Sequence, residues 1–253
     1  MSIMDEFLLT DRVAIVTGAS SGLGVAFARA LSEAGASVVL GARRAERLRS
    51  VAAEIRAAGG RATEVPVDVS SPESCRALAA AAVAEHGRID ILVNNAGVGT
   101  AYPASRETPE QFRSVIDVNL NGSYWMAQAC GVHMQPGSSI VNISSILGIT
   151  TAGLPQAAYA ASKAGLIGLT RDLASQWTGR KGIRVNAIAP GFFPSEMTDQ
   201  YEPGYLESVR SRLLIPRMGR PAECAATLVW LVSPAAGYVT GQTIVVDGGV
   251  TIT

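Results

Sequence analysis

The apolar positions of this chain fall into short runs that alternate with longer segments of helical periodicity. The runs are rich in β-branched residues, are bounded by turn-forming residues and show little polar alternation. They span residues 12–17, 36–41, 63–69, 89–97, 138–145, 183–191 and 243–247. Runs of this kind predict strands buried on both faces of a sheet, so we expect a seven-stranded sheet.

The segments between the runs predict helices. Residues 23–34 place Leu23, Phe27, Ala30 and Leu31 on one helical stripe. Further helices are expected at 44–58, 72–86 and about 109–134, around Tyr159 as far as about Trp177, and twice more before the last strand. Strands that alternate with helices predict an α/β fold: a single doubly wound (Rossmann) domain over residues 1–253, its mostly parallel sheet covered by helices on both faces.

Residues 192–216 are less regular and predict a flap over a site. The segment contains three prolines and a group of apolar side chains. With Tyr102, this group could form an apolar wall for a substrate: Phe192, Phe193, Met197, Tyr201, Tyr205 and Leu206. The same side chains could equally pack at a subunit interface, where aromatic residues are common.

Composition narrows the class of protein. Lys plus Arg and Asp plus Glu each number 21, so the formal net charge is zero and no nucleic-acid partner is expected. No apolar run is long enough for a membrane span, and the first residues lack the basic start of a signal peptide. Cys75, Cys130 and Cys224 lie far apart, as do His86 and His133. We therefore expect a cytoplasmic protein with reduced thiols and no metal site.

A glycine-rich turn lies where the first strand leads into the first helix. Thr17–Gly24 reads T-G-A-S-S-G-L-G, with glycines at 18, 22 and 24. Such a turn brings free N–H groups and a helix N-terminus close to a pyrophosphate, so it predicts a nucleotide site. In a doubly wound sheet the ends of the fourth, fifth and sixth strands would open into the same crevice.

Tyr159 and Lys163 stand four residues apart in the Ala-rich segment Q-A-A-Y-A-A-S-K-A-G-L. On a helix, residues four apart share a face. A cation beside a phenol favours the phenolate, which would make Tyr159 a proton donor near neutral pH. Taken alone, the pair is more often a core tyrosine and a solvated lysine.

Further motifs follow the glycine loop in order. They are D-V (Asp68-Val69), N-N-A-G (Asn94–Gly97), V-N-L (Val118–Leu120), I-S-S-x-x-G (Ile143–Gly148), Y-x-x-x-K (Tyr159–Lys163), N-x-x-x-P-G (Asn186–Gly191) and V-D-G-G (Val246–Gly249). Over essentially its whole length the chain resembles the short-chain dehydrogenase/reductase family, in particular its 3-oxoacyl-(acyl-carrier-protein) reductase-like members.

The resemblance implies hydride transfer between a nicotinamide and a carbonyl or alcohol carbon. It implies Tyr159 as general acid and base, with Lys163 lowering its pKa and binding the nicotinamide ribose. Ser145 would bind the substrate oxygen, and we prefer it to Ser144, which points to the other side of the strand. Asn119 would hold a water in a proton relay to the lysine. The alternatives are turn residues for the serines and a helix-bending amide for Asn119.

The resemblance also implies a set of cofactor contacts. Ser195 stands near the position of a threonine that binds the nicotinamide carboxamide in the family, and its hydroxyl could take that role. The expected set is Gly18, Ser20, Ser21, Gly22, Leu23, Gly24, Arg43, Asp68, Val69, Asn95, Ala96, Gly97, Tyr159, Lys163, Pro190, Gly191 and Ser195.

The end of the second strand predicts the form of the cofactor. An acid there would bind a free 2′-hydroxyl, but Gly41 and Ala42 stand at this place, followed by Arg43 and Arg44. A guanidinium suits a phosphate, so we expect NADP(H) with Arg43 as the main contact and NAD as the alternative. The arginines could instead simply begin a surface helix, and Ser21 stands where many NADP-preferring relatives carry a second basic residue.

Two other functions stay open from the sequence. One is an NAD-linked alcohol or polyol dehydrogenase of the same family, and the other is a non-catalytic cofactor-binding protein. A small-molecule carbonyl or alcohol substrate is expected. The resemblance further implies a homotetramer, in which Ala127, Ala129, Ala164 and Gly168 are small enough for close helix contacts.

Overall fold

The computed structural model describes residues 2–196 and 204–253. Within them seven strands form one sheet in the order β3-β2-β1-β4-β5-β6-β7, and every neighbouring pair is parallel. The strands are β1 (Val13–Thr17), β2 (Ser37–Ala42), β3 (Arg61–Pro66), β4 (Ile91–Asn94), β5 (Ser139–Ile143), β6 (Arg184–Pro190) and β7 (Thr243–Val246). The predicted doubly wound α/β fold is confirmed.

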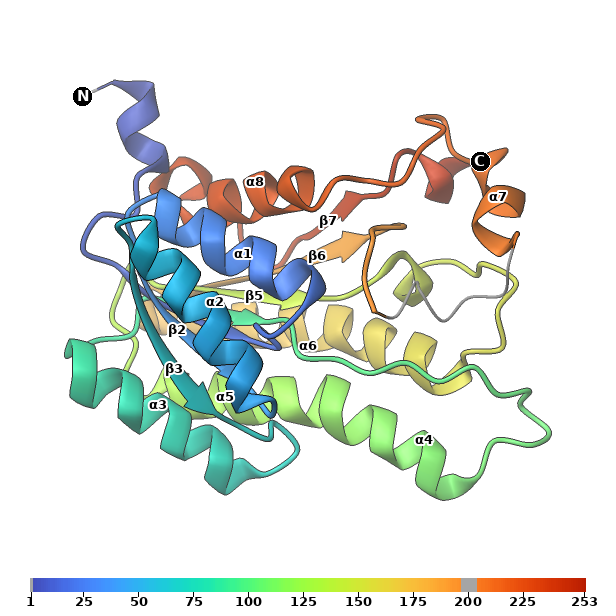
Figure 1. Ribbon diagram of the computed structural model, residues 1–253, viewed down its shortest axis with the longest axis horizontal. Coiled ribbons are helices and arrows are strands. Elements are labelled where there is room, and N and C mark those ends of the chain that lie inside the picture. Colours follow the sequence, from blue (N-terminus) through green and yellow to red (C-terminus); the bar gives the residue numbers. More distant parts are fainter. Residues whose placement is uncertain (1, 197–203) are drawn as a thin grey trace.

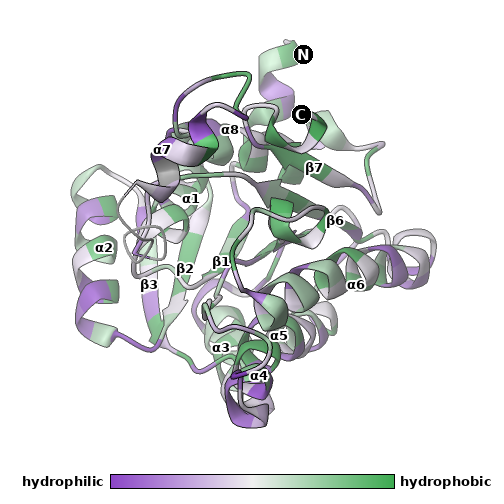
Figure 2. Ribbon diagram, turned by 90° about the vertical axis from the view of Figure 1, so that its right-hand side faces the viewer, coloured by the Kyte–Doolittle hydropathy of each residue, from purple (hydrophilic) through white to green (hydrophobic). Residues whose placement is uncertain are grey.

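Helices cover both faces of the sheet (Figure 1). They are α1 (Gly22–Glu33), α2 (Ala45–Ala57), α3 (Pro72–His86), α4 (Pro109–Ile116), α5 (Gly122–Gly131), α6 (Ala157–Lys181), α7 (Tyr205–Arg210) and α8 (Pro221–Val232). One buried cluster joins the sheet to α1, α2 and α8, and a second joins it to α3, α5 and α6. Figure 2 shows the apolar strands inside the molecule and hydrophilic residues on the outward side of α2.

Local sequence explains where several elements begin and end. Helix α3 starts at Pro72 after Ser71, whose hydroxyl accepts the N–H of Ser74, and it ends before Gly87 in the left-handed conformation. Helix α6 ends before Gly182, also left-handed. It therefore runs to Lys181, beyond the expected end at about Trp177.

The long helix expected at about 109–134 is interrupted. Helix α4 ends at Ile116, a π-helical turn follows at Asp117–Asn121, and α5 begins at Gly122. The apolar spacing did not reveal this turn, because one extra residue in a helical turn shifts the stripe without ending it. Asn119 lies in the π turn and is buried.

The chain order of the strands reverses next to β1, which pairs with β2 on one side and β4 on the other. In doubly wound sheets this switch point is where ligands bind, outside the carboxyl ends of the strands. The expected flap at 192–216 begins after β6 and includes α7. Met197 and Tyr201, which we expected in its apolar wall, lie outside the described residues, as does the side chain of Leu206.

Candidate active site

A cavity of about 490 Å³ lies at the carboxyl ends of the strands, beside the switch point. The glycine loop, the ends of β2, β4, β5 and β6, and the start of α6 contribute its walls. Every residue expected to contact a cofactor lines this cavity, together with Ser145, Tyr159 and Lys163. The fold thus brings together groups that are up to 177 residues apart in the sequence, from Gly18 to Ser195.

The loop requires glycine at two positions, at one for its backbone conformation and at the other because a side chain would not fit. Gly18 has a φ of +65°, in the left-handed region. A Cβ on Gly24 would lie 2.2 Å from the carbonyl oxygen of Gly18, which no real contact allows. The loop therefore folds back on itself and leaves the N-terminus of α1 open toward the cavity, the arrangement that suits a phosphate group.

Asn95 and Thr17 fasten this loop to the end of β4. Asn95 Nδ2 donates to the carbonyl oxygens of Thr17 and Gly18 at 2.9 and 3.2 Å. Thr17 Oγ1 accepts the N–H groups of Asn95 and Ala96, each at 3.1 Å. The Asn95 amide group thus braces the loop from within the protein.

Tyr159 and Lys163 lie on the first turns of α6 and face the cavity. Their side chains are close, since Lys163 Nζ lies 5.5 Å from the centre of the Tyr159 ring. Tyr159 is 9% exposed and Lys163 4% exposed. Burial lowers the pKa of Lys163 to about 8, because the charged amine loses its water. At neutral pH the ammonium still predominates.

The two serines after β5 have different partners. Ser144 Oγ donates to the carbonyl oxygen of Lys163 at 2.8 Å and so ties the strand end to α6. Ser145 Oγ accepts the N–H of Leu147 at 3.1 Å. This acceptor role leaves the Ser145 hydroxyl able to donate toward the cavity that it lines.

Asn119 lies behind Gly97 and is fully buried. Its Oδ1 accepts the N–H of Val98 at 2.8 Å, and its Nδ2 donates to the Val98 carbonyl oxygen at 2.9 Å and to Ser162 Oγ at 3.0 Å. The side-chain amide therefore joins the loop after β4 to α6. A Cβ on Gly97 would lie 3.4 Å from both Asn119 Oδ1 and Lys163 Nζ, so both groups lie close to this glycine.

One end of the cavity, where the sequence predicts the adenosine of a cofactor, is lined by residues that follow β2 and β3. Ala42, Arg43 and Arg44 lie at the end of β2, with Asp68 after β3. Hydrogen bonds from the Ser70 hydroxyl and N–H lower the pKa of Asp68, with a smaller contribution from Arg43. Arg43 is exposed and forms no hydrogen bond or ion pair with the residues that the structure describes.

Glu196, which sequence reasoning missed, lines the cavity beside Ser195. A Cβ on Gly22 would lie 3.4 Å from the Cβ of Ser195, so this segment reaches the start of α1. The side chain of Glu196 binds Arg44 and Arg47 of the β2–α2 region. The sequence showed an acid after β6 and arginines after β2, but nothing that brings them together.

Two further findings concern other kinds of site. Among residues 2–196 and 204–253, no group of three or more His, Cys, Asp or Glu side chains could hold a metal ion. No helix in the same ranges is both long and apolar enough to cross a membrane.

Comparisons with known proteins agree with this geometry. The family described as Enoyl-(Acyl carrier protein) reductase matches residues 18–251. The chain is 39% identical to 3-oxoacyl-(acyl-carrier-protein) reductase FabG of Thermotoga maritima, over 96% of this chain and 99% of that protein. It is 40% identical to the galactitol 2-dehydrogenase (L-tagatose-forming) of Cereibacter sphaeroides, over the full length of both.

A solved structure is similarly close. The gluconate 5-dehydrogenase of Burkholderia cenocepacia J2315, in complex with NADP and tartrate, superposes with a TM-score of 0.94 at 33% identity and full coverage of both chains. With its ordered motifs, its fold and these relatives, the chain belongs to the short-chain dehydrogenase/reductase family of oxidoreductases.

Proposed function

We propose that this protein is an NADP(H)-dependent oxidoreductase that interconverts ketones and secondary alcohols, with Tyr159 as general acid and base. The observation that carries the proposal is the position of three side chains. Ser145, Tyr159 and Lys163 line the same cavity as the glycine loop, so a bound dinucleotide and a substrate would share one space.

The cavity fits a dinucleotide in shape and in chemistry. The close approach of Gly24 to Gly18 leaves backbone N–H groups and a helix N-terminus facing the position of a pyrophosphate. Hydroxyl donors at Ser20 and Ser21 and cations at Arg43 and Arg44 lie on the adenosine side. A bound nicotinamide supplies the hydride, or accepts it in the oxidative direction.

Side chains of the protein donate and accept the proton of the reaction. In the reductive direction the Tyr159 hydroxyl gives its proton to the carbonyl oxygen, and in the oxidative direction the phenolate takes it back. The Ser145 hydroxyl donates a hydrogen bond to the same oxygen. The Lys163 ammonium favours the phenolate by charge, because it lies close to the ring in a site shielded from water.

The preference for NADP(H) rests on the end of β2. Ala42 supplies no carboxylate there, and two guanidinium groups follow it on the cavity wall. Arg44 Nη2 donates to Ser21 Oγ at 2.8 Å, so a cation reaches the glycine loop although Ser21 itself is neutral. This contact compensates for the basic residue that position 21 lacks.

The substrate side of the cavity is apolar. Its lining includes Val98, Ile146, Leu147, Phe192 and Phe193. This wall suits a medium-sized ketone or a 3-oxoacyl thioester, and the relative named as a 3-oxoacyl-(acyl-carrier-protein) reductase supports the second class.

A polyol dehydrogenase is the second candidate, because the relative named galactitol 2-dehydrogenase is 40% identical over the whole chain. That activity would favour NAD, and hydroxyl-rich substrates should then outcompete acyl thioesters. We further propose that the protein is cytoplasmic, since its three cysteines are free and buried, and that it forms homotetramers.

Turnover with both cofactors tests the proposal. The parent should reduce ketones or 3-oxoacyl thioesters with NADPH, and Tyr159→Phe should lower kcat by roughly 10²–10⁴-fold while NADPH still binds. Tyr124→Phe, which removes the hydroxyl of an exposed tyrosine on α5, is the control. Parent protein that binds NADPH but turns over none of the ketones, thioesters or polyols would instead indicate the non-catalytic binding protein.

A further inference from the structure

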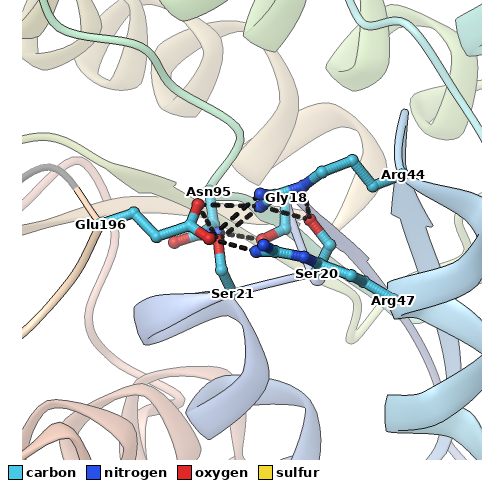
Figure 3. Close-up of polar contacts among 7 residues, drawn as sticks. All are labelled: Gly18, Ser20, Ser21, Arg44, Arg47, Asn95 and Glu196. Atoms are coloured by element: carbon cyan, nitrogen blue, oxygen red, sulfur yellow. Dashed lines mark hydrogen bonds and ion pairs between the residues drawn. The ribbon is translucent and has the colours of Figure 1, made fainter.

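The carboxylate of Glu196 faces the guanidinium groups of two arginines, Arg44 and Arg47, at the edge of the cavity (Figure 3). Arg44 Nη1 donates to Glu196 Oε1 at 3.0 Å, and Arg44 Nη2 lies 3.0 Å from Oε2. Arg47 also donates to Oε1. Glu196 enters from the segment after β6, whereas both arginines come from the start of α2.

The same guanidinium is fixed to the glycine loop. Arg44 Nη2 donates to Ser21 Oγ at 2.8 Å and to Ser20 Oγ at 3.1 Å. Ser21 Oγ in turn donates to Glu196 Oε2 at 3.1 Å. The carboxylate therefore binds a site built from a guanidinium and a loop hydroxyl, which are the groups that would receive a phosphate at the 2′ position of an adenosine ribose.

Charge makes the two anions exclude each other. The hydrogen bonds from Arg44 and Arg47 lower the pKa of Glu196 to about 2, so the group is an anion at neutral pH. A 2′-phosphate bound to Arg44 would lie beside this carboxylate, and the two negative charges would repel each other. One of the two anions has to leave.

Exposure decides which anion leaves. The Glu196 side chain is 48% exposed, and those of Arg44 and Arg47 are 44% and 52% exposed. Ion pairs in such surroundings are individually weak. A phosphate accepts the same bidentate hydrogen bonds from a guanidinium as a carboxylate does, and it carries more charge, so it can displace Glu196.

We propose that Glu196 determines cofactor specificity as an internal anion that competes with the 2′-phosphate for Arg44. The idea rests on the proposed use of NADP(H) and deepens it. Binding of a 2′-phosphorylated ligand includes a cost for displacing Glu196, and a ligand without that phosphate avoids this cost. Removal of the carboxylate charge therefore tightens binding of 2′-phosphorylated ligands selectively.

Titration calorimetry with two adenosine fragments measures this competition without any catalysis. The probes are 2′,5′-ADP and 5′-AMP, which differ only in the 2′-phosphate. Glu196→Gln should tighten 2′,5′-ADP binding by roughly 3- to 10-fold, the size expected for partly exposed charges, and change 5′-AMP binding by less than about 2-fold. Glu54→Gln is the control, because Glu54 is a half-exposed carboxylate of α2, the helix that carries Arg47, and it pairs with Arg29 of α1.

The contribution of Arg44 is tested in a second pair of variants. If Arg44 is the shared cation, Glu196→Gln should have no effect on 2′,5′-ADP binding in an Arg44→Met background. The proposal is overturned if Glu196→Gln leaves 2′,5′-ADP binding unchanged or weaker, tightens both probes equally, or acts equally well without Arg44. Parent protein that binds 2′,5′-ADP no tighter than 5′-AMP contradicts the NADP(H) preference instead, and the effect of Glu196→Gln on the affinity ratio of the probes still tests the competition.

Discussion

Lys163 Nζ donates a hydrogen bond to the carbonyl oxygen of Ile143 at 2.8 Å, and this bond ties α6 to the last residue of β5. The amine is thus held at the cavity wall, close to the Tyr159 ring. Because burial removes water from the charged amine, its pKa falls from the usual 10.5 to about 8. Its charge can therefore change within the range of ordinary activity measurements.

This lowered pKa predicts an alkaline limit on activity. The ammonium that favours the Tyr159 phenolate is present below about pH 8 and is lost as pH rises through that value. We expect kcat/KM for the cofactor, which reports the free enzyme, to fall with an apparent pKa near 8. Lys163→Met should be slow at every pH and lack this limb, whereas Lys181→Met, at the far end of α6, should retain it.

Stability gives an independent measure of the same group. The lysine pKa is lower in the folded state, so between about pH 8 and 10.5 the unfolded chain keeps a proton that the folded protein has released. This term makes stability rise with pH across that window. Urea denaturation should show the term in the parent and not in Lys163→Met, and identical pH dependence in both proteins would contradict the assignment.

Gly24→Ala tests the glycine loop. The new Cβ would meet the Gly18 carbonyl oxygen, a backbone atom, so the loop must shift. Overpacking of this kind costs about 1–3 kcal/mol of unfolding free energy, and NADPH should bind more weakly. Gly179→Ala is the matched control, since nothing lies within 4 Å of its Cβ position on α6 and a helical alanine should add about 0.5–1 kcal/mol. Equal stability of the two variants would contradict the crowding.

Much of the fold could be predicted from sequence because each strand and helix is specified locally. The run at 183–191 corresponds to β6, whose two ends each lie one residue inside the run. Ser71-Pro72 correctly predicted the start of α3. The π turn around Asn119 could not be predicted, because its stabilising partner is the backbone of Val98, outside the helix. That interaction appears only once the loop after β4 packs against α6.

The location of the candidate site could also be predicted, because the carboxyl ends of parallel strands meet at one edge of the sheet. The partners of the individual side chains could not. Asn95 was expected as a cofactor contact, and its side chain is engaged in bracing Thr17 and Gly18. The contact between Arg44 and Glu196 spans 152 residues and depends on the path of the chain after β6, for which composition gives no signal.

A pair of substitutions at the end of β2 should reverse the cofactor preference. Ala42→Asp would place a carboxylate against a 2′-phosphate and offer an acceptor to a free 2′-hydroxyl, and Arg43→Ala would remove a cation from the cavity wall. Each change is expected to be worth about 1.5–3 kcal/mol, or roughly 10- to 150-fold in affinity. The double variant should lose activity with NADPH and gain activity with NADH, measured as kcat/KM with one saturating ketone.

Arg49→Ala is the control for this switch, because Arg49 is an exposed arginine of α2 that pairs with Glu46. Parent enzyme that already prefers NADH would contradict the proposal before any variant is made. A preference for NADPH that survives Arg43→Ala would assign the phosphate contact to Arg44, the cation bound to Ser20 and Ser21.

The positions of four small residues allow a specific test of the predicted tetramer. Ala127 and Ala129 are buried within the subunit, 0% and 7% exposed, and so leave little surface for a helix contact with another copy. Ala164 and Gly168 are exposed, four residues apart on one face of α6, and nothing lies within 4 Å of a Cβ on Gly168. This face is where we expect the helices of two subunits to approach closely.

Light scattering at micromolar concentration should give the parent the mass of four chains. Gly168→Glu places a charge on the proposed contact and should lower that mass, because an unpaired charge is costly to bury between subunits. Gly179→Glu changes an equally exposed glycine near the end of the same helix and should leave the mass unchanged. Circular dichroism checks that both variants remain folded, and a monomer mass for the parent would show that the α6 face is ordinary surface.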